Sequence, residues 1–247
     1  MDGGAGMDQG VEKLREWIGE SGRIVFFGGA GVSTESGIPD FRSENGIFAA
    51  IKRFGSPPEV LLSHEFFMEH PDTFYQYYKT MLLYPKAEPN PAHLALARLE
   101  RQGKLTAVIT QNIDGLHQRA GSRNVLELHG SVNRNRCMRC GCAFTLDELL
   151  AQEGVPKCAC GGLIKPDVVL YGEELDEDVM AEAVAAIRRA DLMIVGGTSL
   201  VVYPAAGLVR YFRGKALVLI NLGETPMDQY AQLVLHAPIG ETLGQCV

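Results

Sequence analysis

Short apolar segments, each followed by glycine or polar residues and separated by helix-like stretches, constrain the fold of this chain most strongly. Such runs are typical of strands in a parallel sheet that is buried on both faces, where polar and apolar residues do not alternate. Strands that alternate with helices therefore predict an α/β fold, with helices on both faces of one sheet. We expect strands at residues 24–27, 105–109, 125–128, 167–171, 191–195, 216–220 and 233–235.

Polar or glycine-rich segments follow most of these expected strands directly. The carboxyl ends of parallel strands share one edge of the sheet, and ligands bind outside that edge. We therefore expect the segments to meet around one site, and their coincidence carries more weight than any single motif. They are Gly28–Arg42, Thr110–Asp114, His129, Thr198-Ser199 and Asn221.

The first of these segments, Gly28–Arg42, is glycine-rich but does not match the usual dinucleotide-binding motif. Gly29 and Gly31 allow a sharp turn and a close approach of the backbone to a ligand. Ser33 and Thr34 follow, where a helix could begin with its N–H groups facing a phosphate. Thr34 stands where the motif has its third glycine, so an ordinary strand-to-helix loop is the alternative interpretation.

The other segments differ in composition. Residues 1–10 are expected to form a flexible tail, and Val11, Leu14, Trp17 and Ile18 recur at helical spacing, which predicts an amphipathic helix over 11–20. Residues 43–85 are rich in aromatic and aliphatic side chains between turns, which favours short helices with a buried core. Further helices are expected at 92–101, 177–189 and 204–212, and a short one at the C-terminus.

Residues 131–165 differ from the rest of the chain, because they have little apolar periodicity and hold the cysteine pairs Cys137-x-x-Cys140 and Cys158-x-Cys160. Four thiolates at this spacing can converge tetrahedrally on zinc, and a site with four sulfur ligands has no open position, so the ion would be structural. Cys142 is a fifth candidate, which leaves one sulfur spare. Unliganded thiols are the alternative. The sequence gives no role for Cys246.

Composition excludes several classes of protein. The chain has 247 residues and a formal net charge of −7, which argues against non-specific nucleic-acid binding. We find no apolar run long enough for a transmembrane helix and no secretory signal, so we expect a cytoplasmic protein without membrane contact. In that compartment six cysteines are interpreted as metal ligands or free thiols rather than as disulfides.

Together, these motifs resemble the sirtuin family of NAD-dependent protein-lysine deacylases. The resemblance covers nearly the whole chain beyond the first ten residues, and its motifs follow in the order of the family. The tight Cys158-x-Cys160 pair and the run from Lys165 to Tyr171 are most similar to a bacterial branch. The motifs that carry it are Gly29–Ser33, Glu35–Arg42, Gln111–Asp114, Leu128–Gly130, the paired cysteines, Gly197–Ser199 and Asn221.

The resemblance implies two domains. Residues 11–42, 86–130 and 166–247 would form a Rossmann-type, NAD-binding large domain. A helical module over 43–85 and a zinc-ribbon module over 131–165 would form the small domain. NAD and the acyl-lysine peptide would enter the cleft between the domains from opposite sides.

The resemblance also implies site residues. Asn112 would help to order the pocket and its water, and Val168 and Val169 would pair with the peptide backbone, although they could equally be plain core strand. Phe41 could also shield the reacting face of the ribose from water. The residues implied to contact NAD are Ala30, Thr34, Phe41, Arg42, Gln111, Ile113, Asp114, His129, Thr198, Ser199, Asn221, Leu222 and Ile239.

The family reaction needs a base, which His129 would provide by its matching position. Nicotinamide leaves the ribose, the acyl oxygen of the lysine attacks the anomeric carbon, and the base then accepts a proton from a ribose hydroxyl. Histidine suits this step because its pKa lies near the operating pH. The products would be free lysine, nicotinamide and O-acyl-ADP-ribose. Taken alone, His129 could instead be a structural histidine at a strand end.

Acyl preference and reaction class are less constrained. Family members that remove succinyl or malonyl groups carry a tyrosine and an arginine three residues apart, but here Arg is absent from 54 to 97. We therefore expect acetyl or another uncharged acyl group. Mono-ADP-ribosyl transfer is an alternative reaction, and a zinc-ribbon binding module without chemistry is an alternative class. A dehydrogenase is disfavoured, because the third glycine and the usual acidic residue are missing.

Overall fold

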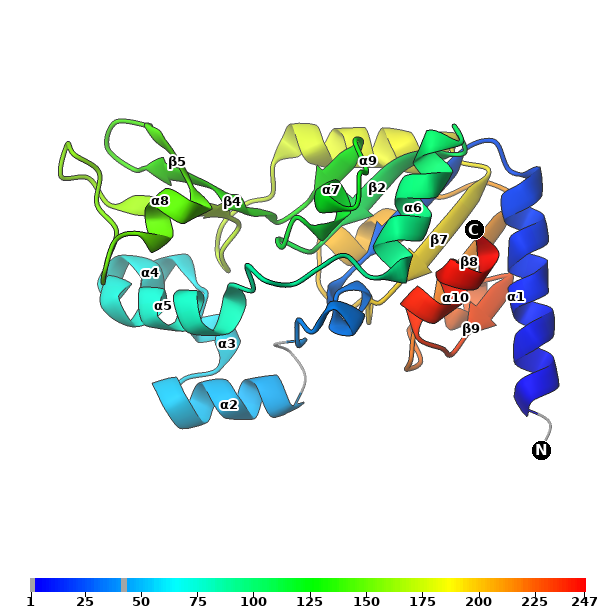
Figure 1. Ribbon diagram of the computed structural model, residues 1–247, viewed down its shortest axis with the longest axis horizontal. Coiled ribbons are helices and arrows are strands. Elements are labelled where there is room, and N and C mark those ends of the chain that lie inside the picture. The colour runs from blue at the N-terminus through cyan, green and yellow to red at the C-terminus, as the bar shows by residue number, and fades with distance from the viewer. Residues whose placement is uncertain (1–2, 41–43) are drawn as a thin grey trace.

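The structure is a computed structural model that describes residues 3–40 and 44–247. Figure 1 shows two bodies joined by extended segments. Within the described residues, the larger body contains a parallel sheet of six strands in the order β3-β2-β1-β7-β8-β9. From the centre of the sheet, β1, β2 and β3 follow one another toward one edge, and β7, β8 and β9 follow one another toward the other edge. This is the Rossmann-type strand order. Its strands are β1 (Ile24–Gly28), β2 (Leu105–Thr110), β3 (Val125–Glu127), β7 (Leu192–Gly196), β8 (Ala216–Ile220) and β9 (Leu233–Leu235).

Both faces of this sheet are buried, as the apolar runs predict. Along β1 the side chains of Ile24 and Phe26 join one core, and those of Val25 and Phe27 join the other. The first core packs against α1 (Gly3–Glu20), α6 (Pro91–Arg101) and α10 (Ile239–Cys246). The second packs against α9 (Glu177–Arg189) and η4 (Ala205–Tyr211). The expected α/β fold with helices on both faces of the sheet is therefore confirmed.

Helix α1 begins earlier than the periodicity predicts. The helix starts at Gly3, so the part of the expected flexible tail that the structure describes is helical. Met7 packs against the core, and Gly10 lies against β9, where an added Cβ would fall 2.5 Å from a Leu235 methyl group. Helix α1 lies along the β9 side of the sheet in Figure 1. Tertiary packing thus extends a helix through a glycine-rich segment of low helix propensity.

Two segments where the sequence allows a helix form 3-10 helices rather than α-helices. Residues 205–211 form a 3-10 helix instead of an α-helix. After β1, the chain enters two 3-10 turns, η1 (Ala30–Val32) and η2 (Thr34–Ser36), rather than a long helix. Helix α9 matches its expected range, and the Asp176 carboxylate caps it by accepting hydrogen bonds from the N–H groups of Asp178 and Val179. The remaining short elements of the larger body are α7 (Leu116–Arg119) and η5 (Asp228–Tyr230).

The smaller body joins a helical module to an antiparallel sheet. In the described residues this sheet has three strands in the order β5-β4-β6. The aromatic side chains of Phe67, Phe74 and Tyr75 are buried in one core that also contains Cys137 and Ile164 from the sheet, which confirms the core interpretation of these aromatics. The elements are α2 (Glu44–Phe54), α3 (Pro58–Leu61), α4 (His64–Glu69), α5 (Pro71–Tyr77), the π-helix η3 (Tyr78–Leu82), β4 (Gly130–Cys137), β5 (Ala143–Thr145), α8 (Leu146–Leu150) and β6 (Ile164–Val168).

The strand expected at 167–171 as part of the parallel sheet lies instead in the small sheet. Strand β6 covers Ile164–Val168 and pairs antiparallel with β4, so it belongs to the small sheet. The domain boundary expected at residue 166 therefore falls inside a strand. Every helix among the described residues is too short or too polar to cross a membrane.

Candidate active site and metal centre

A cavity of about 720 Å³ lies at the carboxyl ends of the parallel strands. The loops after β1, β2 and β7 line it from the larger body, and the segment after β6 lines it from the smaller one. This arrangement brings most of the polar segments together, as the sheet-edge argument predicts. The predicted residues that line the cavity are Ala30, Gln111, Asn112, Ile113, Asp114, His129, Val168, Val169, Thr198 and Ser199.

The glycines of the first loop allow it to pack against the loop after β7. The Gly31 N–H donates a hydrogen bond to the Gly197 carbonyl over 2.8 Å, and an added Cβ on Gly31 would lie 2.7 Å from Gly197 Cα. An added Cβ on Gly29 would lie 2.8 Å from Thr198 Cβ. Gly29 and Gly31 are thus required for the contact between two loops of the cavity, in addition to any approach to a ligand.

Ser33 links the two segments that follow β1 and β2. Its hydroxyl donates to the Asp114 carboxylate over 2.7 Å and accepts a hydrogen bond from the Asn112 amide over 3.1 Å. The other Asp114 oxygen accepts from the Leu116 N–H, so this aspartate stabilises the turn that leads into α7, whose N-cap position is Gly115. Ser33 is almost fully buried, with 1% exposure. Ser33 lies in the glycine-rich segment expected at the site, but no motif in the sequence indicates that its side chain joins Asn112 to Asp114.

His129 is half-buried and held in one tautomer by the backbone. Its Nδ1 lies 3.0 Å from the Gln111 carbonyl, which can only accept, so Nδ1 carries the proton in this hydrogen bond. In the neutral ring, Nε2 then carries the lone pair, which is the form that a general base needs. The Gln111 amide in turn donates to the Thr198 hydroxyl over 3.1 Å, which connects the segments after β2 and β7.

Two further histidines, His93 and His117, lie buried close to Asp114. Their ring centroids are 4.7 Å apart. Burial and, to a smaller extent, the neighbouring His93 lower the pKa of His117 to about 3. Burial also lowers the pKa of His93 to about 4, against the opposing effect of the Asp114 carboxylate. Both rings are therefore neutral at physiological pH.

Four of the predicted NAD contacts lie outside the cavity lining. The Thr34 hydroxyl donates to the Gly31 carbonyl over 2.9 Å, and the Asn221 amide donates to the Gly223 carbonyl over 2.8 Å. Leu222 is 71% exposed, whereas Ile239 is buried in the core beneath Gly196. Phe41 and Arg42 lie outside the described residues.

The charged residues that line the cavity are acidic. In the part of the chain that the structure describes, neither lysine nor arginine lines it. Burial alone would raise the pKa of Glu173, but hydrogen bonds from the Leu170 N–H, His64 and Lys165 hold that pKa below its ordinary value. The described lining is therefore rich in carboxylates, and among them Glu173 is paired with Lys165, which lies behind the lining, over 3.0 Å. The acidic lining residues are Asp40, Asp114, Glu173, Glu174 and Glu177.

The four paired cysteines form one cluster in the smaller body. Their sulfur atoms all lie within 4.8 Å of one another, with Cys137 and Cys160 3.5 Å apart and Cys140 and Cys158 3.6 Å apart. Zinc–sulfur bonds of about 2.3 Å in a tetrahedron separate the sulfurs by about 3.8 Å, so the cluster fits a structural zinc ion. Among the described cysteines, Cys142 and Cys246 are outside the cluster, and Cys142 is therefore the spare sulfur of residues 131–165.

The model of the Sir2 family matches residues 29–204 of this chain. The chain belongs to the Sir2 family. It is 57% identical over 243 residues to an NAD-dependent protein deacetylase of Clostridium perfringens (strain 13 / Type A), a match that covers 98% of this chain and 100% of that protein. The resemblance to the sirtuin family is thereby confirmed.

Solved structures of Sir2 proteins share the fold. One is described as Sir2 with a p53 peptide and NAD+, is 43% identical, has a TM-score of 0.80, and the match covers 94% of this chain and 95% of that chain. Another contains 2'-O-acetyl-ADP-ribose and a deacetylated p53 peptide, is 43% identical, has a TM-score of 0.81, and the match covers 94% and 95% of the two chains. Family membership and fold therefore agree across nearly the whole length.

Proposed function

We propose that this protein is an NAD-dependent protein-lysine deacetylase. The reaction consumes NAD and water and moves the acetyl group from lysine to ADP-ribose, with release of nicotinamide, the free lysine amine and O-acetyl-ADP-ribose. The observation that carries the proposal is the meeting of His129, Gln111 and the Ser33–Asn112–Asp114 cluster in one cavity at the edge of a Rossmann-type sheet. The names of the relatives, NAD-dependent protein deacetylase, support the same activity.

The NAD site extends along the carboxyl edge of the sheet. Its central part is formed by Ala30, Ile113, Asp114, Thr198 and Ser199, which line the cavity. The fit is supported by the loop glycines, since Cβ atoms there would force apart the two loops that flank the site. Asn221 lies at the end of β8, one strand beyond β7, so it extends the site toward the adenosine. Thr34, Phe41, Arg42, Leu222 and Ile239 complete the proposed set, and Ile239 can contribute only through its backbone because its side chain is buried.

His129 acts as the proton acceptor. Bound NAD supplies an electrophilic ribose carbon once nicotinamide leaves. The hydrogen bond from Nδ1 to the Gln111 carbonyl fixes the tautomer in which Nε2 accepts the proton of a ribose hydroxyl. Asn112 holds Ser33, and Ser33 holds Asp114, so the groups proposed to meet the nicotinamide amide are fixed before NAD binds.

The substrate is an acyl-lysine in an extended peptide. Strand β6 is at the edge of the small sheet, so Val168 and the following Val169 lie where a peptide can add as a further strand. An acetyl group fits this cavity better than a succinyl group, because the described lining offers no cation to pair with a carboxylate.

Zinc is held by Cys137, Cys140, Cys158 and Cys160 and stabilises the small body. A site of four thiolates has no open position for substrate, so the metal takes no part in the chemistry. The enzyme acts in the cytoplasm, since a cluster of reduced thiolates is typical of a reducing compartment.

Mass spectrometry of the products tests the proposal. NAD and an acetyl-lysine peptide should give the free lysine peptide, nicotinamide and O-acetyl-ADP-ribose in equal amounts. The His129→Ala variant should lose turnover while it keeps its fold and zinc. A matched control, His70→Ala, removes an exposed histidine outside the cavity lining and should keep wild-type activity. ADP-ribose attached to protein would instead favour ADP-ribosyl transfer, and unchanged activity of His129→Ala would remove His129 from the mechanism.

A further inference from the structure

We infer that Arg134 is a positioning residue, which holds His129 and the edge at Val168-Val169 in fixed relation across the junction between the two sheets. The inference rests on the proposed function, since it names what aligns the base with the peptide edge. Arg134 lies on β4 and is absent from the lining of the cavity. It therefore acts through other residues.

The backbone around His129 connects the large sheet directly to the small one. Strand β3 ends at Glu127, and β4 begins at Gly130, so His129 lies in the link between the sheets. Gly130 pairs with Val168, and the Val169 N–H donates to the His129 carbonyl over 3.0 Å. The candidate base and the candidate peptide edge thus share backbone contacts at this junction.

Gly130 makes these contacts possible. Its φ is +75°, in the left-handed region that favours glycine, and an added Cβ would collide with the Asp167 carbonyl. A side chain at position 130 would therefore force the link that contains His129 away from β6. A small change in the angle between the sheets would alter the distance between His129 and the edge.

Arg134 fixes that angle through two ion pairs. Its Nη1 lies 2.6 Å from the Glu127 carboxylate, at the end of β3, and its Nε lies 2.8 Å from the Asp167 carboxylate, on β6. Glu127 also accepts from the Gln118 amide of α7 over 2.9 Å. These contacts link α7 to β3, β3 to β4, and β4 to β6. Together they span the junction that contains His129.

The two ion pairs of Arg134 with Glu127 and Asp167, called the clamp below, require an arginine. The register of β4 against β6 shifts between Ser131 and Asn135, and Arg134 lies in that irregular stretch. The planar guanidinium offers several donors in a fixed fork, so one side chain can hold two carboxylates, whereas lysine is a single point charge. The Glu127 side chain is only 8% exposed, so loss of Arg134 would leave its charge poorly solvated.

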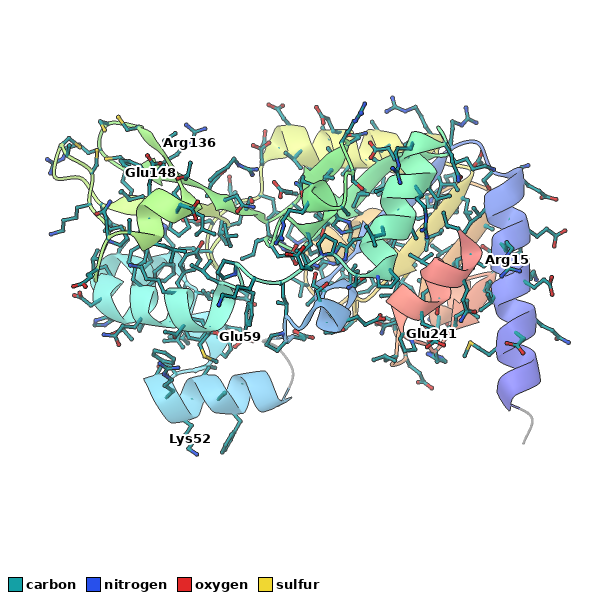
Figure 2. All side chains as sticks on the ribbon, in the orientation of Figure 1. Arg15, Lys52, Glu59, Arg136, Glu148 and Glu241 are labelled. Atoms are coloured by element: carbon teal, nitrogen blue, oxygen red, sulfur yellow. The ribbon has the colours of Figure 1, made fainter. Side chains whose placement is uncertain are left out.

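The matched control for Arg134 is Arg136, two residues further along β4. Its side chain is exposed, and within the described residues it forms no ion pair of its own. Figure 2 labels Arg136 on the smaller body. Arg134→Met and Arg136→Met therefore remove the same charge from the same strand, and only the first breaks the clamp.

The test compares Arg134→Met, Arg134→Lys and Arg136→Met in the full-length, zinc-loaded protein. Arg134→Met should lower kcat/KM for an acetyl-lysine peptide about 3- to 10-fold. Most of this loss should come from a higher KM for the peptide. ADP-ribose affinity and zinc content should stay at the wild-type values, because neither site contacts Arg134. Arg134→Lys should recover part of the loss, and Arg136→Met should resemble the wild type.

Hydrogen exchange gives a readout that does not depend on the proposed activity. Amides of residues 129–132 and 167–170 should exchange faster in Arg134→Met than in Arg136→Met. Equal exchange in the two variants would overturn the inference, and so would parallel losses of peptide turnover, ADP-ribose binding and zinc, which indicate a general structural defect. If Arg134→Met exchanges faster but the wild type shows no deacetylation, the proposed function is wrong, and the inference that Arg134 holds the two sheets together still stands.

Discussion

The buried histidine pair should make this protein sensitive to mild acid, and His117 offers the cleaner test. Burial lowers the pKa of His93 to about 4 and that of His117 to about 3, whereas an unfolded histidine titrates near about 6.5. Between these values the unfolded state binds more protons than the folded state. The free energy of unfolding therefore falls as the pH falls below about 6.5, and it is retained above that pH.

The magnitude follows from the same pKa values. At about pH 5 both rings remain largely neutral in the folded protein, while an unfolded histidine is almost fully protonated. The interval of about 1.5 pH units below 6.5, at about 1.36 kcal/mol per unit, gives about 2 kcal/mol for each histidine. Total stabilities of domains are about 5–15 kcal/mol, so the two together amount to a substantial loss.

Urea unfolding at about pH 7.5 and about pH 5 measures this effect. Neither ring nitrogen of His117 has a hydrogen-bond partner among the described residues, so His117→Leu removes no hydrogen bond and fills a similar volume. The variant should be at least as stable as the wild type at about pH 7.5 and should lose about 2 kcal/mol less on acidification. His70→Gln, at an exposed histidine, should lose as much as the wild type. An equal acid loss in His117→Leu and the wild type would refute this reasoning.

Three further predictions concern the metal, the loop and the acyl group. Cys158→Ser should lose zinc and unfold the ribbon, as metal analysis and proteolysis would show, whereas Cys142→Ser should retain the metal. Gly31→Ala should destabilise the protein by about 1–3 kcal/mol in thermal unfolding because its Cβ would meet the backbone of Gly197, while Gly19→Ala, with open space around it, should not destabilise. A succinyl-lysine peptide should react at least about tenfold more slowly than its acetyl counterpart, since the described cavity lining lacks a cation; faster desuccinylation would contradict this.

The parallel sheet could be predicted from the sequence because its strands are buried on both faces. Segments such as 24–27 and 216–220 are continuous apolar runs, which are typical of strands buried on both faces of a sheet. The run at 167–171 has the same appearance, but its first residues pair with β4 in the small sheet. Apolar character alone does not tell which sheet a strand joins, since pairing depends on residues far away along the chain.

The site could be predicted in outline from the same argument, but its supporting contacts could not. His129, Gln111 and Asp114 follow strands whose carboxyl ends share one edge, so their meeting is a consequence of topology. The contacts of Arg134 join residues from three strands in two sheets, and no spacing in the sequence indicates them. The burial of the Ile239 side chain in the core could not be predicted either, because an apolar residue at the start of a helix can face the core or a ligand.

The absence of a third glycine after β1 also has a structural reason. In dinucleotide-binding loops the third glycine permits close packing of the following helix against the strand. Here the segment after β1 forms two 3-10 turns, and the Thr34 side chain is exposed, so there is no long helix whose packing would require glycine at that position. The glycines that remain, Gly29 and Gly31, are those that touch the loop after β7. The pattern of glycines in this loop therefore follows from loop-to-loop packing, which explains why a cofactor loop of this kind departs from the usual motif.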